Sequence, residues 1–213
     1  KLESLGIPTI DGTEIETDPR KIWQIFGDHF YLYAGTPTGQ WLNHEFKMVF
    51  DIDIELNSDT AMEFYDELTN KLQQPEYFPR TLYDRFNIEV LNTTDAATDL
   101  LEEHQQIKDS GWNARIIPCF RPDSLLYIGL PDWKINIELL SQVSGIEVNS
   151  YSTFISALEN RREFFKGMGA VSTDHAVVMP LTEELTTATA EAIFQRALMG
   201  RADADDESRF MAH

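Results

Sequence analysis

Apolar residues in the first part of the chain recur every three or four positions, which is the spacing of a helix that buries one face. Asp18 and Pro19 are residue types that favour an N-cap and a first helical turn, and Thr36 and Pro37 repeat that pair. Two further runs with helical spacing follow. Residues 1–85 are therefore predicted to form an all-helical unit.

The aromatic residues of this helical unit follow the same spacing. Their intervals of three and four favour packing between helices over a surface on which a sugar ring stacks. These residues are Trp23, Phe26, Phe30, Tyr31, Tyr33, Trp41, Phe46 and Phe50.

Short apolar runs then alternate with helical patterns. The runs at 88–91, 115–120 and 170–172 are short enough for strands, and helical patterns, the first at about 98–110, separate them. This alternation predicts a parallel sheet with helices outside it. The acidic stretch 201–213 is predicted to be a tail or the start of another helix.

Polar residues follow each predicted strand. They form the clusters 92–95 (NTTD), 121–123 (RPD) and 173–175 (TDH). In parallel sheets and (β/α)₈ barrels the chemistry lies at the carboxyl ends of the strands. The three clusters therefore predict one shared site.

Arg121 is the first candidate in this site. Its planar guanidinium can bind a carboxylate through two parallel hydrogen bonds, or it can form a structural ion pair with Asp123. Asp174 and His175 can supply a general base, a contact to a sugar hydroxyl or a metal ligand, or they can cap a helix. Because neighbours along a strand point to opposite faces, we expect only one of these two to face the site.

Two further candidates have weaker sequence support. Thr94, with its neighbours Thr93 and Asp95, offers polar groups for substrate binding but equally fits an ordinary turn. His44 can reach a site if the helical unit acts as a lid, or it can be a packing or surface residue. Cys119 lies within an apolar run and is predicted to be a core residue.

Composition narrows the classes of function. With 36 acidic and 17 basic residues the net charge is −19, which argues against binding to nucleic acid or to anionic membranes. A single cysteine excludes an internal disulfide framework and a cysteine-rich zinc site. No apolar run reaches the length of about 20 residues that spans a membrane. A cytoplasmic protein without a membrane partner is expected.

Four segments of the chain, in the same order and with compatible spacing, resemble the uronate isomerases, also called glucuronate isomerases, of the amidohydrolase superfamily. They are DHFYLYAGTPTGQWLNHEF (28–46), LYDRFNIEVLNTTD (82–95), FRPD (120–123) and RREFFKGMGAVSTDHA (161–176).

The resemblance implies an α/β fold, a distorted (β/α)₈ barrel with a helical insertion after its first strand. Residues 1–85 are then the insertion, and 86–200 are the βαβ part that carries barrel strands 2–4. The implied reaction is aldose–ketose isomerisation through an enediol, of D-glucuronate to D-fructuronate and of D-galacturonate to D-tagaturonate. Arg121 is implied to bind the uronate C6 carboxylate, a divalent metal (zinc) is expected in the full-length enzyme, and a homo-oligomer is expected.

The chain also departs from the family pattern. The family's metal-binding His-x-His is absent, and the later barrel strands are missing. Ala176 replaces the glycine of the family's Ser-Asp-His-Gly, and Ala34 stands where an arginine is frequent. We therefore expect an internal part of a longer enzyme, without a metal of its own and inactive alone. The alternatives are a catalytically silent structural or binding module and another metal-dependent member of the superfamily.

Overall fold

The computed structural model describes residues 2–8, 15–177 and 179–213. It divides into two compact units, Lys1–Ile88 and Glu89–His213. Each unit is described by itself.

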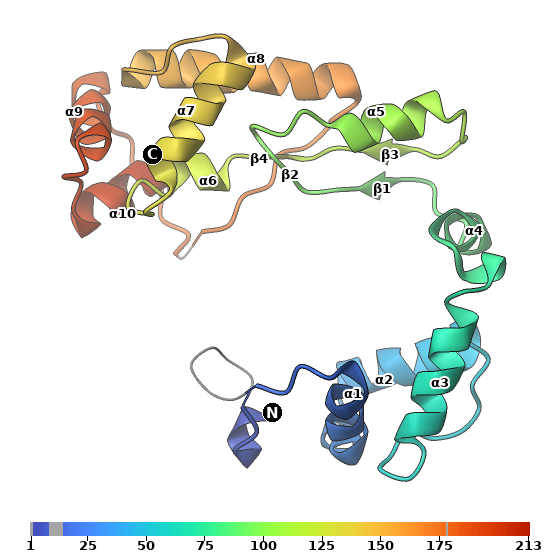
Figure 1. Ribbon diagram of the computed structural model, residues 1–213. Coiled ribbons are helices and arrows are strands. Elements are labelled where there is room, and N and C mark those ends of the chain that lie inside the picture. The colour runs from blue at the N-terminus through green and yellow to red at the C-terminus, as the bar shows by residue number, and fades with distance from the viewer. Residues whose placement is uncertain (1, 9–14, 178) are drawn as a thin grey trace. The chain divides into compact units, whose positions relative to one another are not determined.

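The first unit is built from short helices (Figure 1). Asp18 caps α1 by accepting a hydrogen bond from Arg20, and Thr36 caps α2 by accepting one from Gly39. The elements are η1 (Glu3–Leu5), α1 (Pro19–Asp28), η2 (Phe30–Tyr33), α2 (Pro37–His44), the π-helical turn η3 (Glu45–Val49), α3 (Ala61–Lys71), η4 (Pro75–Tyr77) and α4 (Pro79–Arg85).

Aromatic rings form much of the core of this unit. Phe46 packs edge-on against Phe64 with ring centroids 5.1 Å apart, and both rings are buried. Trp23 lies against Phe46 and donates its indole hydrogen to the carbonyl of Ala61. Core packing does not extend to every aromatic residue of the predicted set. Tyr31 is 66% exposed and Trp41 is 68% exposed.

The second unit combines a small parallel sheet with six helices among its described residues. Its elements are β1 (Leu91–Asn92), β2 (Asp95–Ala96), α5 (Glu102–Asp109), β3 (Ile116–Ile117), β4 (Phe120–Arg121), α6 (Asp123–Leu126), α7 (Trp133–Ser144), α8 (Tyr151–Met168), α9 (Thr187–Leu198) and α10 (Ala204–Ala212).

The four short strands form one continuous ladder. β1 pairs with β3 and β2 pairs with β4, both in parallel and in the same register. Backbone hydrogen bonds from Thr93 to Ile117 and from Asp95 to Cys119 join the two segments. The prediction that polar residues 92–95 end the first strand is therefore wrong. Backbone pairing with 115–121 extends the strand past the apolar run, and polar side chains of this stretch find partners, Asn92 with Ser172 and Thr93 with Asp95.

Residues 170–172, predicted to be the third strand, do not form one. Parallel pairing with β4 is limited to a bridge between Phe120 and Thr173, flanked by hydrogen bonds from Phe120 to Ser172 and from Asp174 to Phe120. The apolar run itself lies outside this bridge, and Val171 is 72% exposed. The sheet contact is made instead by the polar residues that follow.

The helix predicted at 98–110 begins later, at Glu102. Leu101 has a positive φ of 55°, and its backbone N–H donates to the Asp99 side chain. Arg161 of α8, which is 3% exposed, donates to the carbonyls of Ala97 and Asp99. These contacts hold the residues after β2 in an irregular turn and delay the helix.

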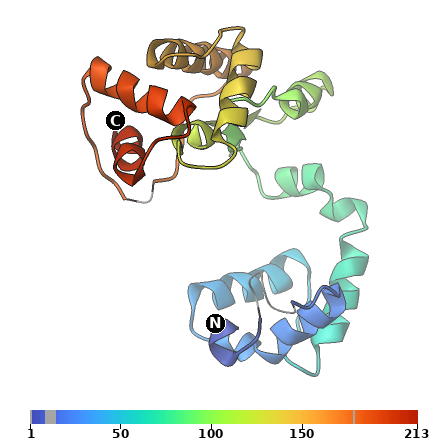
Figure 2. The same ribbon diagram turned by 60° about the vertical axis from the view of Figure 1, so that its left-hand side comes forward.

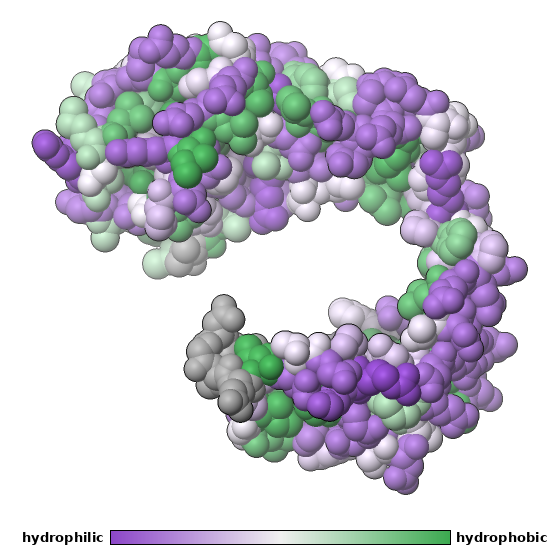
Figure 3. Space-filling view, viewed as in Figure 1, coloured by the Kyte–Doolittle hydropathy of each residue, from purple (hydrophilic) through white to green (hydrophobic). Residues whose placement is uncertain are grey.

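The core of the second unit lies between its helices. Both views place α10 beside α9 (Figures 1 and 2). Hydrophilic residues cover most of the visible surface of each unit (Figure 3). Among the described residues, no helix has both the length and the apolar character needed to cross a bilayer. The largest fully buried side chains of this core include Trp133, Leu140, Phe154, Phe165 and Phe194.

Candidate functional site

Arg121 lies at the carboxyl end of β4, beside the polar residues that follow the bridge at Thr173. Its Nε donates a hydrogen bond to Asp123 Oδ2 at 2.5 Å, and Nε lies 3.9 Å from Asp174 Oδ2. The Arg121 side chain is 36% exposed. The structure thus brings Arg121 and Asp174 together, and it also contains the ion pair with Asp123 that was the structural alternative.

The electrostatics keep Arg121 charged. The hydrogen bond to Asp123 raises the pKa of Arg121 above its ordinary value, and the attraction of the negative charge of Asp123 raises it further. Within the described part of the chain, Nε is the side-chain nitrogen of Arg121 that makes a hydrogen bond. The edge formed by Nη1 and Nη2 is therefore available to a carboxylate, which can accept two hydrogen bonds from it.

Asp174 and His175 have different surroundings. The pairing of Phe120 with Thr173 sets Asp174 beside Arg121, and the Asp174 side chain is 51% exposed. His175 instead lines a cavity of about 270 Å³ together with Thr173 and with Arg162 of α8. Of this pair, Asp174 thus lies at Arg121, and His175 lies in the cavity.

Thr94 is exposed and lies on the same face as Arg121. The register on either side of it places Thr94 beside Cys119, and Ala96 pairs with Arg121. Because alternate residues of a strand share a face, Thr94 and Ala96 point the same way. Thr94 is therefore part of the surface that leads to Arg121.

The opposite face carries a polar cluster that the sequence analysis did not identify. Thr93 Oγ1 lies 2.7 Å from Asp95 Oδ2 and 2.8 Å from His104 Nε2. The side chains of Asp95 and His104 are 14% and 9% exposed. The hydroxyl has one hydrogen, which it donates to the carboxylate, so His104 Nε2 donates to Thr93 Oγ1. This cluster joins α5 to the sheet. In the sequence its one signal was the alternation that puts Thr93 and Asp95 on the same face of a strand.

His44 is the last residue of α2 in the first unit, and it is exposed. Its suggested action on substrate from a lid stays a prediction. Cys119 is buried with 2% exposure, as expected for a core residue.

The divalent metal that the resemblance implies would need several ligands close together. Among the described residues, no group of three or more His, Cys, Asp or Glu side chains is placed to hold a metal ion. The residues present here do not fit such a metal, and we derive no step through one.

Comparisons with known proteins agree on one family. The family model described as glucuronate isomerase matches residues 6–213. The uronate isomerase of Nostoc punctiforme is 49% identical over 212 residues, which are 100% of this chain and 44% of that protein. The uronate isomerase of Brucella canis is 42% identical over 211 residues, which are 99% of this chain and 45% of that protein.

Solved structures give the same result. The glucuronate isomerase of Caulobacter crescentus superposes with a TM-score of 0.91 at 34% identity, over 100% of this chain and 46% of that one. The uronate isomerase of Thermotoga maritima gives a TM-score of 0.82 at 27% identity, over 91% of this chain and 43% of that one. The chain thus spans less than half the length of these relatives. Since the family model covers nearly all of it, the chain belongs to the glucuronate isomerase family.

Proposed function

We propose that the natural protein containing this chain isomerises hexuronates between aldose and ketose, D-glucuronate to D-fructuronate and D-galacturonate to D-tagaturonate. Membership of the family supports the reaction. The observation that carries the proposal within this chain is the open Nη edge of Arg121 beside Asp174. A permanently charged guanidinium at the carboxyl end of a strand suits an anionic sugar in a protein of net charge −19.

The fold assignment is part of this proposal. The parallel ladder, with Thr173 bridged to its far side, supports strands 2–4 of a (β/α)₈ barrel. Residues 1–85 are proposed to be the helical insertion and 86–200 the βαβ part of the barrel. The 201–213 segment, which contains α10, then belongs to a helical connection.

The residues have distinct proposed roles. Arg121 binds the C6 carboxylate with Nη1 and Nη2 and so fixes the orientation of the sugar. Asp174, beside it, contacts a sugar hydroxyl or moves a proton during the shift between C2 and C1. The opposite orientation of His175 favours Asp174 over it for this task. Thr94 contacts substrate from the neighbouring strand, and His44 is proposed as a further contact to substrate.

The test is the conversion of D-glucuronate by the natural protein and by its Arg121→Lys variant. Lysine keeps the charge but loses the planar pair of donors, so we expect the KM for D-glucuronate to rise about tenfold or more. An unchanged KM would contradict the carboxylate role of Arg121. Hydrolysis of an amide or ester substrate, without isomerisation of D-glucuronate, would favour another reaction of the superfamily, and absence of any turnover would favour a silent module. Scattering of the same sample tests the expected homo-oligomer.

A further inference from the structure

Asp123 connects two different segments at the candidate site. Its Oδ2 accepts the hydrogen bond from Arg121 Nε at 2.5 Å, while its Oδ1 accepts one from the backbone N–H of Ala176 at 2.9 Å. The Asp123 side chain is 20% exposed. One carboxylate therefore fixes both the guanidinium and the backbone two residues after Asp174.

Tyr127 strengthens this connection. It lies four residues after Asp123, and its hydroxyl donates to the carbonyl of Ala176 at 3.0 Å. Both polar backbone groups of Ala176 are thus held by side chains that follow β4. The segment carrying Asp174 is consequently fixed relative to Arg121.

The arrangement keeps Asp174 from forming a direct hydrogen bond with Arg121. Asp174 Oδ2 lies 3.9 Å from Arg121 Nε, which is beyond hydrogen-bonding distance, and Nε already donates to Asp123. If Asp123 released Nε, Asp174 could move onto the Nε edge and neutralise the guanidinium. Charge-assisted pairs of this kind are the stronger hydrogen bonds of proteins, so a substrate carboxylate would then have to displace Asp174.

We propose that Asp123 is a positioning residue, which turns the Nη edge of Arg121 toward the substrate carboxylate and keeps Asp174 from occupying the arginine. The inference rests on the proposed binding of a uronate at Arg121. It makes Asp123 a determinant of affinity for the carboxylate of the sugar. Asp123 takes no part in the proton shift between C2 and C1.

The experiment uses the natural protein and its Asp123→Asn variant. Arg121 Nε and the Ala176 N–H donate to different oxygens of Asp123, and asparagine replaces one of these oxygens by an NH₂ group that cannot accept, so one of the two donors loses its present acceptor. We expect the KM and the Kd for D-glucuronate to rise about tenfold, with a smaller change in kcat. Asp132→Asn is the matched control, because this exposed carboxylate precedes α7 and contacts neither group. It should leave both constants unchanged.

Two further variants separate positioning from folding. Tyr127→Phe removes a single hydrogen bond from an exposed hydroxyl, and it should weaken D-glucuronate binding in the same direction by about threefold. In the double variant Asp123→Asn/Asp174→Asn the competing carboxylate is gone. Equilibrium binding of D-glucuronate should then recover most of the tenfold loss, even though turnover falls.

The outcomes distinguish the two proposals. If the unaltered protein binds no D-glucuronate, the proposed function fails, and this inference fails with it. If the unaltered protein binds D-glucuronate and Asp123→Asn binds it equally well, the positioning role alone is wrong. A double variant that binds no better than Asp123→Asn contradicts the competition by Asp174.

Discussion

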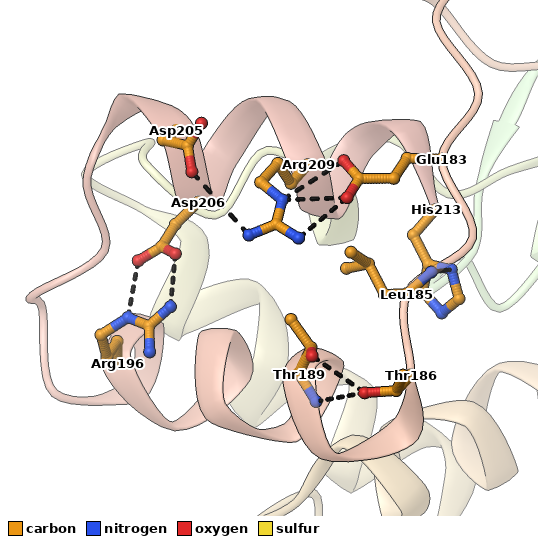
Figure 4. Close-up of polar contacts among 9 residues, drawn as sticks. All are labelled: Glu183, Leu185, Thr186, Thr189, Arg196, Asp205, Asp206, Arg209 and His213. Atoms are coloured by element: carbon orange, nitrogen blue, oxygen red, sulfur yellow. Dashed lines mark hydrogen bonds and ion pairs between the residues drawn. The ribbon is translucent and has the colours of Figure 1, made fainter.

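Arg196 of α9 donates two hydrogen bonds to the carboxylate of Asp206 in α10, from Nε to Oδ2 at 2.7 Å and from Nη2 to Oδ1 at 2.5 Å (Figure 4). Asp206 is 5% exposed, whereas the Arg196 side chain is 44% exposed. Next to this pair, Arg209 binds Glu183 (Figure 4). The two arginines thus tie α10 to the preceding helix and to the segment before it.

The pair of Arg196 and Asp206 makes stability depend on pH. The hydrogen bonds from Arg196 lower the pKa of Asp206 below its unfolded value of about 3.9. A carboxylate with a lowered folded-state pKa stabilises the fold fully above the unfolded value, and this contribution is lost as the pH falls through the folded-state pKa. Asp206→Asn should therefore lower the Tm by about 4 °C at neutral pH, and the difference should shrink below about pH 4.

Thermal unfolding followed by circular dichroism at several pH values measures this effect. Asp205→Asn is the control, since the side chain of Asp205 is 78% exposed and lies 3.9 Å from Arg209. It should change the Tm by less than Asp206→Asn does, because exposed ion pairs stabilise little. A Tm difference for Asp206→Asn that stays constant into acid would contradict the assignment to this carboxylate.

Among the Lys and Arg residues of the second unit, we expect replacement of Arg161 to lower the free energy of unfolding most. It is 3% exposed, and it donates to the carbonyls of Ala97, Asp99 and Val143. Arg161→Met keeps an unbranched side chain in this buried position but leaves these carbonyls without that donor, so we expect a loss of about 3 kcal/mol in the free energy of unfolding.

Urea denaturation checks the change at Arg161. The neighbouring Arg162, which is exposed on the same helix, gives the matched control Arg162→Met. The control should unfold at nearly the same urea concentration as the unaltered protein. Equal losses in both variants would show that helix α8, and not the buried hydrogen bonds, sets the effect.

Thr93 and Thr94 provide a test of the two faces of the sheet. Thr93→Val replaces a hydroxyl that lies 2.7 Å from Asp95 and 2.8 Å from His104 by a methyl group of similar size. It should cost about 1–2 kcal/mol of stability, because two largely buried polar groups lose a partner. Thr94→Val, on the exposed face, should leave the urea midpoint nearly unchanged and affect only the KM for D-glucuronate.

Urea midpoints and the KM for D-glucuronate, measured for both variants in the natural protein, test this prediction. A reversed pattern, with Thr94→Val as the destabilising change, would contradict the strand register described above. Loss of stability in both variants would mean that the two hydroxyls are equally buried.

Local signals in the sequence predicted the helix starts at Asp18 and Thr36, because an N-cap depends only on residues within one turn. Alternation likewise predicted that Asp174 and His175 would separate, but not which one would meet Arg121. That choice depends on the pairing of Phe120 with Thr173, more than fifty positions apart in the chain. Contacts that join distant segments decide the rest of the site.

The delayed start of α5 illustrates the same limit. Residues 98–101 have no helix-breaking glycine or proline, so the sequence favours an earlier start. The turn there is fixed by Arg161, some sixty positions later, and by the Asp99 side chain. A tertiary contact thus overrides the local preference for a helix.

Gly39 and Gly167 lie in helices, and we expect opposite effects when each is replaced by alanine. At Gly39 in α2 a Cβ would lie 2.2 Å from the carbonyl oxygen of Tyr33, a backbone atom that cannot rotate away. At Gly167 in α8 no atom of the described residues, apart from the chain neighbours and the backbone of the helix itself, lies within 4 Å of the added Cβ. Gly39→Ala should cost about 1–3 kcal/mol through overpacking. Gly167→Ala should stabilise by up to about 1 kcal/mol, since alanine favours a helix more than glycine does. Urea denaturation of both variants measures the difference, and a gain in stability from Gly39→Ala would contradict the close approach of η2 to α2.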